Sequence, residues 1–207
     1  METTSHSHIS KTCLAYLAQF DRVDSLNENS LQAYPLSKYA AKSWIYHAKS
    51  GKIDSTPDLQ KLTTHFLLHD HVRANWVRIW DIDTPWKRAD LTRAPHTVAS
   101  PLYYASMACL GVVVKTLIES GADVNVQGGR YGSALQAASY QGSEAIVKML
   151  IESGADVNVQ GGYYGSALGV ALSFGYSVIA QLLLDNGAEV GDLPEPASES
   201  ETSSSSA

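Results

Sequence analysis

The sequence lacks the residues and patterns that mark several large functional classes. Two cysteines, Cys13 and Cys109, are too few for a disulfide framework, so we expect buried thiols in a reducing compartment. The formal net charge is −6 and there is no basic cluster, which argues against nucleic-acid binding. No basic segment followed by an apolar one opens the chain, and the uncharged stretch 97–114 contains a proline, so neither a secretory signal nor a membrane span is expected. The cytoplasm is the expected location, and the nucleus remains open.

Glycine and tryptophan are unevenly distributed over the 207 residues. Residues 1–97 contain Gly51 alone of the fifteen glycines, but all four tryptophans. They carry twelve basic and ten acidic residues, whereas residues 98–207 carry three basic and eleven acidic ones. The two parts therefore have net charges of +2 and −8. This difference predicts two structural units that meet near residue 97.

A repeat with a period of 33 residues fills most of the second part. The twelve residues IESGADVNVQGG occur at 118–129 and again at 151–162, and a shorter version, NGAEVG, occurs at 186–191. A second motif follows the same period: SPLYYA at 100–105, SALQAA at 133–138 and SALGVA at 166–171. We expect three copies of one structural unit.

The middle copy predicts a pair of helices. Ser133 begins a short helix over residues 134–140, and Gly142 ends it. Ser143 is expected to cap a second helix with a single apolar face, which Gly154 ends in the left-handed conformation.

Two further features of this unit lie outside the apolar face. Glu144 and Lys148 are four residues apart and are expected to pair on the exposed face. Gly161 and Gly162 suit a hairpin-like turn. Such a unit cannot bury its own apolar face, so the copies must stack as a solenoid.

These motifs resemble ankyrin repeats, which share the period, the TPLHxA-like start and the GADVN ending. The resemblance covers residues 98–193, as repeats at about 98–130, 131–163 and 164–193. It departs from the family at the TPLH histidine, which ties turn to helix and is replaced by Tyr103, Gln136 and Gly169. Some local rigidity is therefore expected to be lost. Cys109 occupies the place of a helix-ending glycine, which predicts an irregular turn in the first unit.

The first 97 residues show four apolar stripes at helical spacing, which predict a small helical bundle. The stripes begin at Ile9, after Pro35, after Thr56-Pro57 and at Val72. Three repeats are close to the minimum for stability and need covered ends, so the bundle is expected to cap the first repeat. The fold class expected is all-α, with an N-terminal helical bundle followed by an ankyrin-repeat solenoid.

The N-terminal part also resembles the helical linker that precedes ankyrin arrays in fungal NLR-like proteins, which are signalling NTPases with a NACHT domain. The segments that carry this resemblance are 12–21, 34–48 and 75–86. The phosphate-binding motif GxxxxGK[ST] of such NTPases is missing: Gly51-Lys52 has Tyr46 in place of the first glycine and is followed by Ile53. The resemblance therefore implies that the chain is the sensor end of such a signalling protein, and it does not imply ATPase activity. Residues 194–207, acidic and rich in serine, are expected to be a disordered tail.

Two groups of side chains suggest an alternative function as an enzyme. His65 and His69 are four apart on an expected helix, with His71 beyond, which would suit a metal-dependent enzyme, although Phe66 stands where the HExxH motif needs glutamate. Asp81 and Asp83 form a possible acid–base pair, but a loop in which both cap the next segment explains them better. We expect no enzyme, no catalytic residue, no metal and no cofactor.

The main functional hypothesis is protein binding on the concave ankyrin surface that the turn fingers and inner helices form. The resemblance places on it Met107, Gln127, Arg130, Tyr131, Tyr140, Gln160, Tyr163, Tyr164 and Ser173. Tyrosine and arginine dominate the energetics of protein interfaces. Tyr131 and Tyr164 could equally pack one finger against the next. A net charge of −8 on this part predicts a partner with a neutral to basic patch.

Overall fold

The protein is all-α in the residues that the computed structural model describes, 2–22 and 24–190. The tail expected at 194–207 lies outside them. Eleven α-helices and two short 3₁₀ turns follow one another, and the described residues contain no strand, only an isolated bridge between Gln127 and Ser133. The fold class predicted from the sequence is thus confirmed. None of the described helices is long and apolar enough to cross a membrane.

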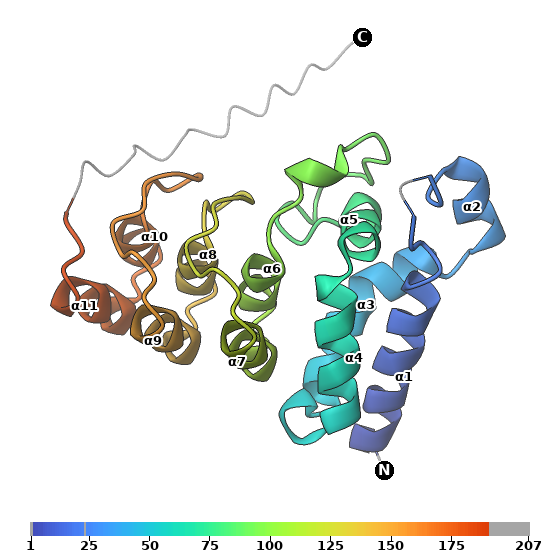
Figure 1. Ribbon diagram of the computed structural model, residues 1–207, viewed down its shortest axis with the longest axis horizontal. Coiled ribbons are helices and arrows are strands. Elements are labelled where there is room, and N and C mark those ends of the chain that lie inside the picture. Colours follow the sequence, from blue (N-terminus) through green and yellow to red (C-terminus); the bar gives the residue numbers. More distant parts are fainter. Residues whose placement is uncertain (1, 23, 191–207) are drawn as a thin grey trace, which may run out of the picture.

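The N-terminal part is a bundle of five helices (Figure 1). Their bounds are α1 (Glu2–Leu17), α2 (Glu28–Ala33), α3 (Ser37–Ser50), α4 (Pro57–Leu68) and α5 (Asp70–Ile79), with a 3₁₀ turn η1 (Ile53–Ser55) before α4. The four helices expected from apolar stripes are α1, α3, α4 and α5. The short α2 has no buried residue and therefore no stripe; it is held by a capping box between Asn27 and Ser30.

Aromatic rings form the centre of the bundle and extend into the repeats. Trp44 and Trp76 are fully buried, with their ring centroids 5.4 Å apart, and Phe66 packs against both. The indole nitrogen of Trp76 donates a hydrogen bond of 2.9 Å to the carbonyl of Ala41. The ring of Trp76 also contacts Tyr104 in the first repeat, at 5.5 Å between centroids. Bundle and repeats therefore share one hydrophobic core.

Three helix pairs follow in two rows (Figure 1). The inner helices are α6 (Pro101–Met107), α8 (Ala134–Tyr140) and α10 (Ala167–Ser173), and the outer ones are α7 (Gly111–Glu119), α9 (Glu144–Glu152) and α11 (Ser177–Asp185). Ser100, Ser133 and Ser166 cap the inner helices, each accepting a hydrogen bond from the backbone three residues later. In the bundle, α4 packs against α6 and α7, on the side of the first repeat opposite the second.

Three local expectations need correction. Ser143 precedes α9, but its side chain makes no capping hydrogen bond. Lys148 pairs with Glu152 at 3.8 Å on the following turn instead of with Glu144. Cys109 does not make the first turn irregular: with φ at +54° it adopts the left-handed conformation of Gly142, at +66°. The turn keeps its hydrogen bond, from the amide of Leu110 to the carbonyl of Ala105.

Asparagines at the end of the first two GADVN motifs tie one unit to the next. The side chain of Asn125 donates to the carbonyl of Gly154 at 3.1 Å and accepts from the amide of Asp156 at 2.8 Å. One period later, Asn158 makes the same two bonds, to Gly187 and from Glu189. These asparagines explain the identity of the GADVN copies, because each side chain must fit the same turn 29 to 31 residues further on.

The fingers between the helix pairs are held by backbone hydrogen bonds and by one glutamine. Gly161 donates to the carbonyl of Gly165 at 2.7 Å, and Tyr163 donates to the carbonyl of Arg130 in the preceding finger at 2.9 Å. Gln136 stands at the position of the missing histidine, and its side-chain amide donates to the carbonyls of Gly161 and Gly165. In the second unit, Gln136 thus supplies hydrogen bonds to the finger, and the loss of rigidity expected from the missing histidine does not occur.

Glycine 162 is required both by its conformation and by its neighbour. Its φ of +68° is left-handed, and an added Cβ would collide with the backbone carbonyl of Tyr131. Gly154 is also left-handed, with φ at +88°, but a Cβ added there would meet no atom within 4 Å. We predict that Gly162→Ala lowers the free energy of unfolding by clearly more than Gly154→Ala, which meets only the left-handed strain of about 1–2 kcal/mol. Urea unfolding of the two variants measures the difference, and equal losses would contradict the close finger contact.

Candidate functional site

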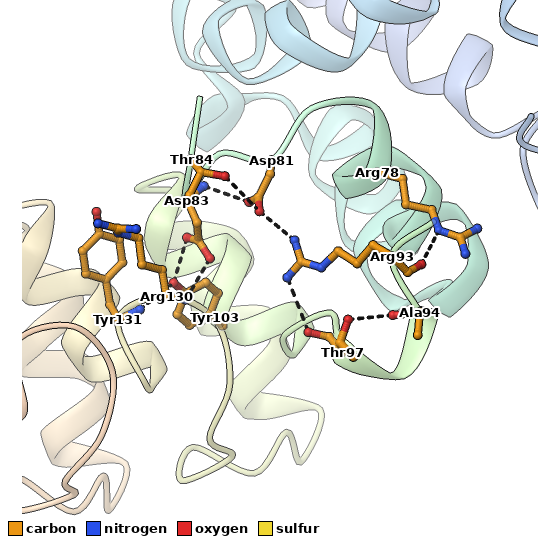
Figure 2. A network of polar contacts seen from close by, with 10 residues as sticks. All are labelled: Arg78, Asp81, Asp83, Thr84, Arg93, Ala94, Thr97, Tyr103, Arg130 and Tyr131. Atoms are coloured by element: carbon orange, nitrogen blue, oxygen red, sulfur yellow. Dashed lines mark hydrogen bonds and ion pairs between the residues drawn. The ribbon is translucent and has the colours of Figure 1, made fainter. Parts of the chain in front are cut away.

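The loop after α5, residues 80–94, joins the bundle to the first repeat and is held by ion pairs and hydrogen bonds (Figure 2). Asp81 forms a salt bridge of 2.6 Å with Arg93. Its carboxylate also accepts a hydrogen bond from the backbone amide of Asp83, two residues later, as an aspartate that caps its own turn does. Arg78, near the end of α5, donates to the carbonyl of Arg93 at 2.7 Å. The loop is therefore fixed at both ends by arginine side chains.

Asp83 connects this loop to two elements of the repeats (Figure 2). Its carboxylate accepts a hydrogen bond of 2.7 Å from the hydroxyl of Tyr103 on α6 and one of 3.1 Å from the backbone amide of Arg130 in the first finger. The same Tyr103 hydroxyl accepts a hydrogen bond from the amide of Tyr131 at 3.3 Å. Asp83 thus connects the loop to residues 20 and 47 positions further on, Tyr103 and Arg130. The expected capping of the next segment did not include this role.

Burial dominates the electrostatics of this bridge. Only 2% of Asp83 is exposed, and burial raises the pKa of its carboxyl to about 6, although the bonds from Arg130 and Tyr103 act to lower it. Burial, together with the nearby carboxylate, also raises the pKa of Tyr103 well above its usual range, so its hydroxyl keeps the proton that it donates. Since all these groups are engaged with one another, the pair Asp81 and Asp83 is arranged as a structural link between the bundle and the repeats.

The side chain of Arg130 extends from this link to the surface. Its guanidinium lies 4.5 Å from the ring centroid of Tyr163 in the next finger and 5.4 Å from that of Trp86 in the loop after α5. Trp86 is 64% exposed. We call these three residues the arginine clamp. Such stacking on aromatic faces is favourable for a guanidinium and holds it in one orientation.

Tyrosines predicted on the concave surface form a column beside the clamp. The ring of Tyr131 is stacked on Tyr140 at 3.9 Å between centroids and lies parallel to Tyr164 at 6.2 Å. Phe174, which is 41% exposed, contacts both Tyr140 and Tyr164 edge-on. Tyr131 is only 2% exposed, so it supports the column from below, while Tyr140 and Tyr164 are half-buried and reach the surface.

The other residues predicted for the surface differ in exposure. Gln127, Gln160 and Ser173 are exposed. Met107 is buried, with its sulfur 3.4 Å from the side-chain amide of Gln141. The structure therefore brings Arg130 and Tyr163 together, and also Tyr131, Tyr140 and Tyr164; the two groups touch where the rings of Tyr163 and Tyr164 meet edge-on at 4.8 Å between centroids. Met107 belongs to the packing between the first two repeats.

Sequence reasoning missed Trp86 and Phe174. Trp86 lies in the N-terminal part, 44 residues before Arg130, and no periodicity links it to the repeats. Phe174 could have been found, because it is a large aromatic at the helix-end position where the repeats above have Ala108 and Gln141.

The charge of the concave surface differs from that of the repeats as a whole. In the fingers, taken as residues 126–133 and 159–166, and in the inner helices α6, α8 and α10, Arg130 is the one charged side chain. The acidic residues of the described repeats lie on the outer helices or in the turns that follow them: Glu119, Asp123, Glu144, Glu152, Asp156, Asp185 and Glu189. The net negative charge is thus not presented where the fingers and inner helices meet.

The histidines of the metal alternative sit where two helices meet. His69 ends α4 and precedes α5, whereas His71 lies in the first turn of α5, beside Asp70. The ring centroids of His65 and His69 are 6.4 Å apart. Within the described residues, no three or more His, Cys, Asp or Glu side chains are grouped so that they could hold a metal ion.

Comparison with known proteins agrees with the repeat geometry. Residues 102–193 match the family model for ankyrin repeats, in three copies. A protein described as azaphilone pigments biosynthesis cluster protein L, from Monascus ruber, is 36% identical over 153 residues, which make up 67% of this chain and 32% of that protein. Residues 102–193 are therefore three ankyrin repeats. Because ankyrin repeats are units of protein–protein interaction, the chain carries such a module.

The Tyr103 hydroxyl should contribute measurably to stability. Tyr103→Phe keeps the ring but leaves the buried amide of Tyr131 unpaired and Asp83 with one donor fewer, a loss of about 1–3 kcal/mol. Tyr104→Phe is the matched control, since the equally buried hydroxyl of Tyr104 takes no part in the bridge and lies beside the backbone of Ala99 without a well-formed hydrogen bond to a described residue. Thermal and urea unfolding should show a large loss for the first variant and little for the second; equal effects would mean that the bridge is unimportant.

The raised pKa of Asp83 predicts a pH dependence of known sign. The folded chain holds this proton more tightly than the unfolded chain, whose aspartate has a pKa near 3.8, so the contribution of Asp83 to stability is lost as the pH rises through about 6. The difference amounts to at most about 3 kcal/mol. The stability of the wild type relative to Asp83→Asn, measured by urea unfolding between pH 4 and 7.5, should decrease toward neutral pH. A flat or rising difference would show that Asp83 does not titrate as stated.

Proposed function

We propose that the chain binds a protein partner through the concave ankyrin surface, centred on the arginine clamp. The observation that carries this proposal is the position of Arg130, the one charge of that surface, held between the exposed Trp86 and the ring of Tyr163. Arginine, tryptophan and tyrosine are the residues most enriched among interface hot spots. A guanidinium that is already ordered loses little side-chain entropy when a partner binds.

The partner that this surface fits is neutral where it meets the tyrosine column and presents a carboxylate or carbonyl oxygen to Arg130. The net charge of the repeats led us to expect a partner patch that is either neutral or basic. A neutral patch suits the concave surface better. A basic segment would meet acidic side chains only at the outer helices and turns, such as Glu152 and Asp156. Gln127 and Gln160, both exposed on the fingers, can add hydrogen bonds at the rim.

We further propose that the chain acts as the sensor end of a signalling protein of the fungal NLR-like type, located in the cytoplasm. The support is the resemblance of segments 12–21, 34–48 and 75–86 to the linker that precedes ankyrin arrays in that family. The relative from Monascus ruber, named for a pigment biosynthesis cluster, is about three times the length of the segment that matches it, so its remaining two thirds fall outside this resemblance. A search upstream of the coding sequence for an in-frame GxxxxGK[ST] motif tests this role, and its absence would count against it.

Side-chain truncation in the clamp tests the binding surface without disturbing its scaffold. The bonds of Arg130 to Asp83 and Tyr163 run through its backbone, so Arg130→Ala keeps them. Arg130→Ala and Trp86→Ala should each weaken partner capture about tenfold or more, as expected for hot-spot residues, with unfolding temperatures close to the wild type.

Tyr46→Ala provides the control, because Tyr46 is a 63% exposed aromatic on α3 of the bundle. The measurement is quantitative affinity capture from a lysate of the source cells, followed by direct titration of the partner so identified. If the proteins lost with Arg130→Ala are lost equally with Tyr46→Ala, or if none is lost, the concave surface is not the binding site.

A further inference from the structure

A pocket of about 640 Å³ opens in the N-terminal bundle, lined by residues of α2, α3, the end of α5 and the loop after α5. Its apolar lining comes from Leu31 on α2, Ile79 at the end of α5, and Trp80 and Leu91 in the loop. The volume lies in the range of small-molecule sites in proteins, about 300–1,000 Å³. This pocket shares no residue with the arginine clamp, although Lys87 directly follows Trp86 in the loop.

Four cations surround the apolar lining. Lys38 and Lys42 come from α3, and Lys87 and Arg88 from the loop, against a single acid, Glu28. None of the four forms a salt bridge with a described carboxylate; the ion pairs of the described chain involve other cations. The N-terminal part has a net charge of only +2, yet four of its cations line this pocket with one acid. An anion bound among them would relieve their mutual repulsion and gain attraction from each.

Aromatic groups lie next to these charges. The ammonium of Lys42 is 5.2 Å from the ring centroid of Trp80, and Tyr39 lines the same pocket with half of its surface exposed. A flat apolar group entering the pocket would therefore find ring faces to pack on, within reach of the cations. Inorganic anions would use only the charges, and neutral apolar compounds only the lining.

The walls of the pocket are held in place by contacts elsewhere on the same segments. The amide of Asp90 donates to the carbonyl of Arg78 at 2.9 Å, and the amide of Lys87 donates to that of Thr84, also at 2.9 Å. Asp90 accepts from both the amide and the hydroxyl of Thr92. The loop that supplies Lys87, Arg88 and Leu91 is thus preformed, which reduces the entropy lost on binding.

We propose that this pocket binds a small organic anion that combines an apolar, preferably aromatic, body with one carboxylate, sulfonate or phosphate group. The body lies against Trp80, Ile79 and Leu91. The charged group lies among the ammonium and guanidinium groups of Lys38, Lys42 and Arg88.

Isothermal titration calorimetry on the full chain with naphthalene-2-sulfonate tests this assignment. Inorganic sulfate supplies the charge alone and 2-naphthylmethanol supplies the ring alone; each should bind at least about tenfold more weakly than the complete anion. Equal affinity for either fragment, or no binding of the sulfonate up to millimolar concentration, would overturn the proposal.

A pair of double variants separates the pocket from general electrostatics. Lys42→Ala with Arg88→Ala should weaken sulfonate binding about tenfold, since two cations near the anion are removed. Lys49→Ala with Lys61→Ala removes the same charge from exposed positions of α3 and α4 outside the pocket and should leave the affinity unchanged. If both variants lose affinity equally, the sulfonate responds to net charge only and the site is wrong; circular dichroism of the wild type and the two double variants confirms that each is folded.

Discussion

The buried carboxylate of Asp83 is the contact on which the relation between bundle and repeats depends. It is nearly inaccessible to water, yet it receives hydrogen bonds from an inner helix, through Tyr103, and from the first finger, through the amide of Arg130. Burying a carboxylate is unfavourable unless such donors meet it, so loop, helix and finger must be correctly placed together. The orientation of the Arg130 side chain on the surface follows from this arrangement, because its own backbone is one of the donors.

The helices and the repeats were predictable because their causes are local or periodic. Ser133 and Gly142 mark the ends of α8 by capping and by a left-handed turn, and both effects act within a few residues. The 33-residue period gives the second half of the chain its architecture, since identical motifs must make identical contacts with their neighbours. Asn125 and Asn158 illustrate this. They occupy the same position in two copies of the motif, and each makes the same pair of hydrogen bonds to the following unit.

The parts that escaped prediction have causes far apart in the sequence. Nothing near Asp83 indicates a bond to Tyr103 or Arg130, and nothing near Trp86 indicates a stack on Arg130, because these pairs form only when the bundle is docked on the repeats. The effect of residues that depart from the ankyrin pattern was wrongly predicted for a related reason. Cys109 follows the left-handed turn that the surrounding helices impose, and Gln136 supplies donors in place of a histidine, so tertiary context decided the outcome at both sites.

The asparagine contacts give the stack of repeats a direction. Asn125 completes the turn of the second unit, and Asn158 that of the third, while neither needs its successor to satisfy its own backbone. A unit that loses its successor therefore exposes one side chain, whereas a unit that loses its predecessor returns backbone groups of its turn to water. We therefore expect such a stack to open from its C-terminal end, one helix pair at a time. The bundle is attached to the opposite end, so the clamp residues contributed by the loop and the first finger belong to the portion that opens last.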